Sequence, residues 1–520
     1  MAPRRAHRRV HSGQIVTAQA AAVVVVLTAG HPGGLAAATL LLAVAFGRLR
    51  GRWLFQWIHP AAGLAVRTAR GARWPTVPAG AGDGTTVLEV GPPTGGIATP
   101  VELPPVELLA TGDPPVAVGL LVNGCTAPDR GGPPATSYRD LTGGGTLTTR
   151  RLLLTARAPD GGDLDGAVRR IGRRLAPLTV RPLPAPAAGE PARERWSAVR
   201  AGALDHVTYH LSGIDADVLP RLLALPAVAT TVAVRDGGML VRVACAPDGG
   251  VPATDRALRA LLAARGGALC RLDGEHLPGL AATLPGLPTS LPRVASRAGA
   301  AGDGPRRVLR VPAAGVAVGR DHAGAPVLVD LFGPAPVRLL LVGDLRLAWV
   351  LVWRALGAGV RVRVHTGRWG AWRPLAEAAA GAPLHVAAPG PADGGTPHEP
   401  VLHLLDSPAA GFPDPADGRW CAQVVVRPQV VAADSPVLAR AEVVVARALD
   451  EPESTLVSAA LGLGRAGTAL RHVDSQSLTV VCQGTPREVM PALTAAERDL
   501  VGRGSAAAAG MARSPAWVSS

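Results

Sequence analysis

The stretch VRLLLVGDLRLAWVLVWRALGAGVRVRVH, residues 337–365, decides the predicted fold of this 520-residue chain. Val337–Val342 is a short apolar run typical of a buried strand, Leu345–Leu356 is predicted as a helix, and Val360–His365 is predicted as a second strand. Continuous apolar strands that alternate with helices are typical of a parallel sheet. The stretch therefore predicts a mainly parallel, Rossmann-like α/β sheet.

The same alternation continues on both sides of this stretch and defines a second block over residues 301–504. A turn at Asp321 and His322 is predicted to precede a strand over Pro326–Leu331. The remaining elements of this block are predicted strands over Pro383–Ala387, Val401–Leu405, Ala422–Val426, Glu442–Ala446 and Leu478–Val481, and predicted helices over Trp372–Ala380 and Pro486–Val501.

A first block is predicted over residues 85–300, after a linker over 60–84; a flexible tail follows the second block over 505–520. Strands mixed with helices indicate a layered α/β or α+β domain. The predicted strands are Pro115–Val122, Thr146–Ala156, His206–Leu211, Thr230–Val234 and Met239–Ala244, and the predicted helices are Asp163–Leu175, Asp215–Leu225 and Asp255–Ala264. Each helix begins with an aspartate, which suits an N-cap.

Composition excludes several classes of site. The chain has no lysine, so a Walker A lysine, a Schiff base and a lysine general base are all absent. The five cysteines are far apart, without a C-x-x-C, which argues against a structural zinc site or a disulfide framework. The net charge is +14, but aromatic residues make up only 3% and no nucleic-acid motif occurs, so no nucleic-acid partner is expected.

The N-terminal residues 1–59 predict a transmembrane hairpin in contact with membrane lipid. One helix over the apolar stretch of about 34 residues would be about 50 Å long, whereas the hydrocarbon core is about 30 Å thick. The segment GHPGG at 30–34 divides the stretch into two spans, 13–30 and 33–47. The expected anchor residues are Ile15, Val23, Val24, Val25, Val26, Leu27, Leu35, Leu40, Leu41, Leu42, Val44 and Phe46.

Arginines flank the apolar stretch on both sides, which predicts the orientation by the positive-inside rule. They are Arg4, Arg5, Arg8, Arg9, Arg48, Arg50 and Arg52. The sequence thus predicts a multi-pass plasma-membrane protein whose large domain is cytoplasmic. A secretory signal peptide is the alternative, but the apolar region runs on past its turn without a clear cleavage site.

Several segments, in order along the chain, resemble EccE, a membrane subunit of type VII (ESX) secretion systems. After the paired spans these are GRW (51–53), DHVTYH (205–210), LPAVATTV (225–232), LCRLDGEH (269–276), LPG (284–286), VGRDHAG (318–324), LF (331–332), LVGD (341–344) and WRALGAGV (353–360). The resemblance covers nearly the whole chain, and 85–145 matches loosely.

The resemblance implies a non-catalytic structural subunit of the secretion complex, in an actinobacterial host. Its implied partners are EccB, EccC, EccD and the protease MycP, and its implied fold is glycosyltransferase-like. No catalytic residue, cofactor or metal is expected on this hypothesis.

The alternative is a membrane-tethered, nucleotide-sugar-dependent glycosyltransferase-like enzyme. Asp215-Ala216-Asp217 is a D-x-D pattern that would hold a metal, although two acids at a helix start also suit the helix dipole. The turn at Gly343-Asp344 has the general shape of a phosphate loop, but its acid competes with a phosphate. His206 and His210 share one face of a strand at about 13 Å apart, which is too far for one metal.

Trp349 and Trp353 are four residues apart on a predicted helix and share a face. Core packing is one interpretation of this pair. The other is an aromatic anchor at a subunit interface, where tryptophan is enriched.

Overall fold

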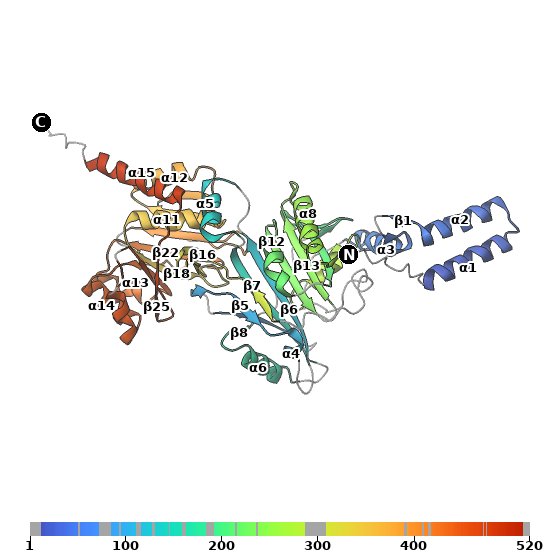
Figure 1. Cartoon of the computed structure of the whole chain (residues 1–520), viewed down its shortest axis with the longest axis horizontal. Helices are drawn as coiled ribbons and strands as arrows, with labels where there is room; N and C mark the ends of the chain where they lie inside the picture. The colour runs from blue at the N-terminus through green and yellow to red at the C-terminus, as the bar shows by residue number, and fades with distance from the viewer. Residues whose placement is uncertain are drawn as a thin grey trace.

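The computed structural model describes residues 12–49, 52–71, 85–92, 95–110, 116–126, 131–144, 146–158, 163–183, 192–213, 216–235, 238–286, 308–388, 390, 393–407, 410–413, 418–471, 473–474 and 476–512. Along its longest axis the chain forms three parts (Figure 1). These are a helical hairpin at the N-terminal end, a ten-stranded sheet in the middle, and an eight-stranded sheet at the C-terminal end.

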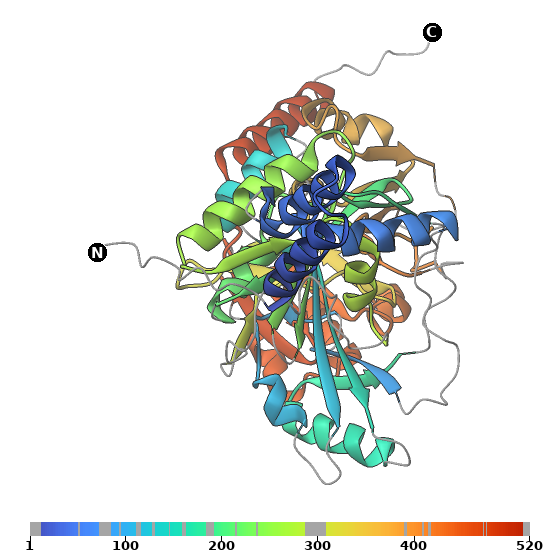
Figure 2. The same cartoon turned by 90° about the vertical axis from the view of Figure 1, so that its right-hand side faces the viewer.

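The N-terminal part is a pair of antiparallel helices followed by a third. Helices α1 (Ser12–Leu27) and α2 (Pro32–Phe46) are joined by a turn in which Ala29 and Gly30 have positive φ. A two-stranded ribbon, β1 (Arg48–Leu49) with β2 (Arg52–Trp53), leads into α3 (Phe55–Ala69). The hairpin projects away from both large sheets, and Figure 2 looks along this projection.

These helices correct the prediction of two membrane spans. The turn at residues 28–31 and the end of α2 at Gly47 leave helices of 16 and 15 residues, about 24 and 22 Å long at about 1.5 Å per residue. Within the described ranges, no helix has the length and apolar character needed to cross a bilayer. The predicted spans, and with them the multi-pass plasma-membrane location, are therefore wrong.

The residues expected as anchors and flanks lie as follows. The expected anchors all fall on α1 or α2. Of the arginines, Arg48 and Arg52 lie on the ribbon, whereas Arg4, Arg5, Arg8, Arg9 and Arg50 fall outside the described residues. The expected linker at 60–84 begins with the second half of α3, which contains Pro60, and 72–84 falls outside the described residues.

The first block is built on a ten-stranded sheet in which every pair is antiparallel. The strand order is β8-β3-β7-β6-β12-β13-β11-β10-β9, and β14 also pairs with β11. The strands are β3 (Thr85–Gly91), β6 (Ala117–Thr126), β7 (Leu147–Arg157), β8 (Thr179–Pro182), β9 (Ala192–Glu194), β10 (Val199–Ala201), β11 (Leu204–Ser212), β12 (Ala229–Arg235), β13 (Gly238–Cys245) and β14 (Ala268–Arg271).

Helices cover this sheet where the sequence has amphipathic runs. They are α4 (Val106–Ala110), α6 (Leu164–Leu175), α7 (Leu219–Leu223, after a 3-10 turn at Ala216–Val218), α8 (Gly250–Ala263) and α9 (His276–Ala282). The Asp163 carboxylate accepts from the amide of Gly166 at 2.7 Å, which confirms its predicted N-cap role. In contrast, α8 begins five residues before Asp255, so that aspartate is not a cap.

The second block is built on an eight-stranded sheet of order β20-β19-β21-β22-β18-β23-β24-β25. Strands β18 to β23 pair in parallel, and β24 and β25 add an antiparallel hairpin at one edge. The strands are β18 (Val337–Val342), β19 (Arg361–Thr366), β20 (Leu384–Ala387), β21 (Val401–Asp406), β22 (Cys421–Arg427), β23 (Val443–Arg447), β24 (Leu478–Cys482) and β25 (Thr485–Val489). The helices are α11 (Leu345–Gly357), α12 (Trp369–Ala378), α13 (Ser435–Leu438), α14 (Glu451–Ala460) and α15 (Ala495–Ala512), with 3-10 turns at Ala432–Asp434 and Gly464–Arg471.

The fold class is therefore mixed α/β with a large antiparallel sheet, and the predicted fold class, two spans followed by one mainly parallel Rossmann-like region, is corrected. The predicted helix at Pro486–Val501 is also wrong in its first part. Gln483 and Gly484 have positive φ and turn the chain into β25. Thr494 then begins α15 by exchanging hydrogen bonds with Glu497, and this helix includes part of the expected tail.

Segments of the two blocks are exchanged, which joins the sheets. Strand β4 (Ile97–Ala98) pairs with β17 (Pro326–Val329) beside β16 (Val316–Arg320), and β5 (Val101–Leu103) pairs with β15 (Leu309–Val311). Helix α5 (Pro133–Thr142) comes from the first block but packs against α11 and α15 (Figure 1). A Cβ at Gly357 of α11 would lie 2.5 Å from the carbonyl oxygen of Pro134, so only glycine allows this close approach.

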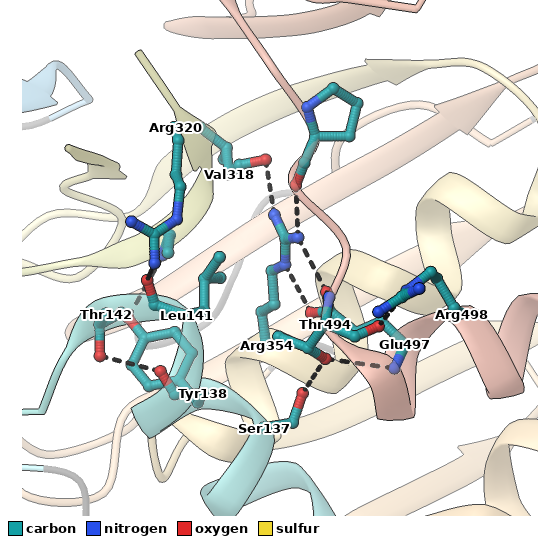
Figure 3. A network of polar contacts seen from close by, with 12 residues as sticks. Ser137, Tyr138, Leu141, Thr142, Val318, Arg320, Arg354, Thr494, Glu497 and Arg498 are labelled. Atoms are coloured by element: carbon teal, nitrogen blue, oxygen red, sulfur yellow. Dashed lines mark hydrogen bonds and ion pairs between the residues drawn. The ribbon is translucent and has the colours of Figure 1, made fainter. Parts of the chain in front are cut away.

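A buried arginine lies where these segments meet (Figure 3). Arg354 of α11 is 1% exposed. It donates to both carboxylate oxygens of Glu497 at 2.7 and 3.0 Å and to the carbonyls of Val318 and Pro491, each at 2.7 Å. Nearby, Ser137 bonds Thr494 at 2.6 Å, which attaches α5 to the start of α15. One side chain thus joins α11, β16 and α15.

We expect Glu497→Ala to lower the free energy of unfolding by about 3–5 kcal/mol, because it leaves the Arg354 cation buried without its carboxylate. Urea unfolding of the two purified proteins measures the difference. The matched control is Glu377→Ala, which removes a solvent-exposed partner of Arg373 and is expected to change stability by less than about 1 kcal/mol. Equal effects of the two substitutions would contradict this account.

Candidate functional site

The carboxyl edge of the parallel strands is the first place to search, because open α/β sheets bind ligands there. At the end of β18, the Asp344 carboxylate accepts from the amide of Leu347 at 3.1 Å. The start of α11 is thus capped by the protein's own negative charge, in the place that a phosphate would occupy. We therefore interpret this turn as the N-cap of α11 and not as a phosphate-binding loop.

Farther along the same edge, a buried carboxylate is fully occupied by neighbouring donors. Asp406 at the end of β21 is 4% exposed. It accepts from the indole of Trp372 at 2.8 Å, from the hydroxyl of Thr366 at 3.0 Å and from the guanidinium of Arg368. These contacts hold α12 against the sheet, so we interpret Asp406 as a structural residue.

Two histidines lie side by side on β19 and β21. The ring nitrogens of His365 and His403 are 3.1 Å apart, and His403 also contacts the carbonyl of Asp393 at 2.9 Å. Burial lowers the pKa of both imidazoles, so both are neutral at pH 7. Among the described residues, no three His, Cys, Asp or Glu side chains form a group suited to a metal ion.

The residues of the D-x-D pattern are not brought together as a metal site. Asp215 falls outside the described residues. Asp217 forms an ion pair with Arg265, and its side chain is 58% exposed. A carboxylate that an arginine already neutralises is a weaker cation ligand. The ion pair of Asp217 therefore favours the interpretation that this acid has a structural role at the start of a helix.

The tryptophan pair lies in the core of the second block. Trp349 and Trp353 are 4% and 2% exposed and pack within the cluster around α11. The structure therefore places both indoles inside this chain, as the core interpretation expects, with little surface to offer a partner.

A cavity of about 1310 Å³ lies between the two sheets. It is a more distinctive candidate for a binding site than the carboxyl edge of the parallel strands. Its lining includes residues of β6, β11 and β13, the segment 224–229 that leads into β12, and, from the other side, α5 and residues 396–399. The polar residues that line it include Asn123, His206, Arg242 and His398. Arg139 and one acidic residue, Glu399, line it as well. It is therefore a large cavity with polar groups along part of its wall.

His206 is held neutral in this cavity. Its Nδ1 lies 3.0 Å from Nη1 of Arg242, and because arginine only donates, Nδ1 accepts and the ring proton is on Nε2. Burial, followed by the charges of Arg242 and His398, lowers the pKa of His206 to about 3. His210, on the same face of β11, makes no contribution to the cavity lining.

Sequence reasoning singled out His206 but missed Arg242. Arg242 lies within the apolar run Met239–Cys245, which is buried on both faces, so alternation does not mark it. The signal that could have found it is a charged residue inside such a run, because buried charges need a partner.

Comparison with known proteins gives no family for this chain. No family model matches it, and no curated protein matches it. Similar solved structures include the genome packaging NTPase B204 from Sulfolobus turreted icosahedral virus 2 in complex with AMPPCP, with 8% identity, a TM-score of 0.24, and coverage of 31% of this chain and 100% of that chain. The same NTPase with sulfate gives 10% identity, a TM-score of 0.22, and coverage of 31% and 98%. Similarity this weak carries no argument for this chain.

We expect a UDP-sugar with Mn²⁺, or ATP with Mg²⁺, to raise the melting temperature no more than inorganic phosphate does at the same concentration. The reason is that Asp344 caps α11 and Asp217 is paired with Arg265. Differential scanning fluorimetry measures this, with MnCl₂ or MgCl₂ alone as the control. A saturable rise that needs the nucleotide would mean that the fold binds it.

The lowered pKa of His206 predicts acid sensitivity. The unfolded state takes up a proton near pH 6.5 that the folded state refuses until about pH 3, so this contribution to stability is complete above pH 6.5 and is lost as the pH falls toward 3. His206→Asn keeps an acceptor for Arg242 and does not titrate. Between pH 7.5 and 5, its unfolding free energy should fall by about 1–2 kcal/mol less than that of the wild type.

Urea unfolding at the two pH values checks this expectation. His322→Asn is the control, because it makes the same substitution at an exposed histidine, its side chain 73% accessible, outside the cavity. If His206→Asn loses as much stability as the wild type between pH 7.5 and 5, the neutral state assigned to His206 is wrong.

Proposed function

We propose that this chain is a non-catalytic structural subunit of a type VII (ESX) secretion complex, similar to EccE, whose function is to bind neighbouring subunits. Two kinds of support carry the proposal. One is the series of EccE-like segments that follow one another in order along the chain. The other, which carries most weight in the structure, is the apolar surface of the N-terminal hairpin.

This surface is large and exposed. Helices α1 and α2 pack on each other, and the side-chain amide of Gln14 donates to the carbonyl of Ala45 at 3.0 Å. Their outward side chains have exposed fractions of 37–79%: Ile15, Val16, Val23, Val26, Leu27, Leu35, Leu40, Leu41, Leu42 and Phe46. Contiguous apolar surface of this kind marks an interaction site. In a secretion complex, apolar surface of other subunits would cover it.

The hairpin is connected to the first block by a specific contact of α3. Arg67 donates from Nε and Nη2 to the two carboxylate oxygens of Glu194, at 2.7 and 3.1 Å, and to the carbonyl of Gly274. The indole rings of Trp57 and Trp196 lie 5.5 Å apart. A bidentate ion pair and a ring contact fix the direction of α3, so binding at the hairpin would position the large sheets relative to the partner.

The test is an affinity pull-down of the tagged protein from gently solubilised host cells, read by native gel and mass spectrometry. We expect EccB, EccC, EccD and a MycP-like protease in one large complex with the wild type. The double variant Val26→Glu/Leu40→Glu adds charges to the exposed hairpin surface and should lower this recovery at least about tenfold, equivalent to about 1.4 kcal/mol or more of binding free energy.

The matched control is Leu108→Glu, which adds a charge at an apolar residue of α4 that is 55% exposed on the first block. It should leave recovery unchanged, and thermal unfolding should be similar in all three proteins. A wild-type protein recovered alone, or with phospholipid and no other subunit, would contradict the proposal. Equal recovery with the hairpin variant would contradict the role of the hairpin.

A further inference from the structure

Arg242 is a buried cation that has no carboxylate partner among the residues that the structure describes. It lies on β13, near the middle of the ten-stranded sheet, between Thr231 of β12 and Thr208 of β11 in the strand register. The residue is 9% exposed. Burial lowers the pKa of its guanidinium to about 10, so the group remains charged at neutral pH.

Every hydrogen-bond partner of this guanidinium among the described residues is neutral. Nε donates to the hydroxyl of Thr283 at 2.8 Å, Nη2 to the hydroxyl of Thr231 at 2.9 Å, and Nη1 to Nδ1 of neutral His206 at 3.0 Å. A guanidinium has five N–H groups. These three bonds leave one hydrogen on Nη1 and one on Nη2 for another acceptor.

The other buried arginines of the described chain each have the carboxylate partner that Arg242 lacks there. Arg354 binds both oxygens of Glu497, and Arg427, which is 5% exposed, binds Asp434 at 2.7 Å. A buried charge is costly unless an opposite charge accompanies it. Arg242 is also buried, at 9% exposed, and lacks such a partner among the described residues, although the fold provides one for each of the other two.

The two remaining hydrogens belong to a residue that lines the cavity. Arg242 and His206 both contribute to its wall, as do the side chains of Asn123 and His398. Asn123 lies beside Arg242 across β12, where its amide donates to the hydroxyl of Thr231 at 3.3 Å. Arg139 and Glu399 line the same cavity, among mostly apolar residues. A few polar groups in a largely apolar wall are the usual composition of a site that fixes a ligand group.

We propose that the cavity binds a small oxyanion, the phosphate or carboxylate group of a ligand, and that the guanidinium of Arg242 is its charged anchor. One free N–H on each of Nη1 and Nη2 can donate to an oxygen of either group. The binding is separate from the subunit contacts proposed for the N-terminal hairpin, and it requires no catalytic step. Arg242 is the positioning charge of the site, and His206 fixes its orientation.

The competing interpretation is that Arg242 is only a hydrogen-bonding centre that joins β12, β11 and Thr283. The two interpretations differ in the effect of Arg242→Met, which removes the charge and keeps much of the volume. A structural centre would lose stability in every buffer. An anion anchor without its anion is an uncompensated buried charge, which offsets part of the loss of its three hydrogen bonds. The stability difference between the variant and the wild type should therefore be smaller in NaCl alone than with the bound anion.

The experiment measures melting temperature and calorimetric binding for the purified full chain, with inorganic phosphate and with succinate as separate probes and NaCl at equal ionic strength as the reference. We expect a saturable rise in the wild type with at least one probe and none with Arg242→Met. The probe that saturates at the lower concentration identifies phosphate or carboxylate as the preferred group. Arg259→Gln, which removes an exposed arginine paired with Asp255, should behave like the wild type.

Arg242→Lys keeps a positive charge without the guanidinium N–H groups. It therefore tests the proposal even if Arg242→Met fails to fold. We expect its Kd for the same probe to rise at least about tenfold. The proposal is overturned if neither anion exceeds NaCl in the wild type, or if the anion effect persists in Arg242→Met or is unchanged in Arg242→Lys.

Discussion

The Arg354 guanidinium in α11 is buried, and its four hydrogen bonds reach a carboxylate and two carbonyls on three other segments of the chain (Figure 3). A cation in that position is stable only while Glu497 stays beside it. This requirement holds α15 against α11. It also keeps Thr494 beside Ser137 on α5, so a helix of the first block is fixed within the second.

The same joining of blocks creates the space between them. Tyr138 on α5 is buried, and its hydroxyl donates to the carbonyl of Gly315 at 3.1 Å. Thr148 and Thr149 at the start of β7 donate to carbonyls of Ala358 and Pro397 in the second block. The cavity that Arg242 lines therefore depends on contacts between blocks. The apolar hairpin lies at the far end of the chain, beyond α3 (Figure 1), which separates the proposed docking surface from the proposed ligand site.

Local patterns predicted the individual elements well and their assembly poorly. Val337–Val342 is a strand with the predicted bounds, and the helix after it extends one residue beyond its predicted end. The predicted helix at 486–501 is wrong in its first part because the turn at Gln483 and Gly484, where φ is positive, leads into β25. The exchanged strands arise from contacts over more than 100 residues, and the side-chain contacts of Arg242 reach residues 11 to 41 positions away. Periodicity encodes neither. Of the candidate site, only His206 was visible in the sequence.

The central claim is that Arg354 and α5 join the two sheets into one cooperative body. Native-state hydrogen exchange read by mass spectrometry tests it most directly, because it gives the opening free energy of each strand. The account predicts that β6 and β12 of the ten-stranded sheet and β18 and β22 of the eight-stranded sheet exchange through one opening of similar free energy. If either sheet opened at a much lower free energy while the other stayed protected, the claim would be contradicted.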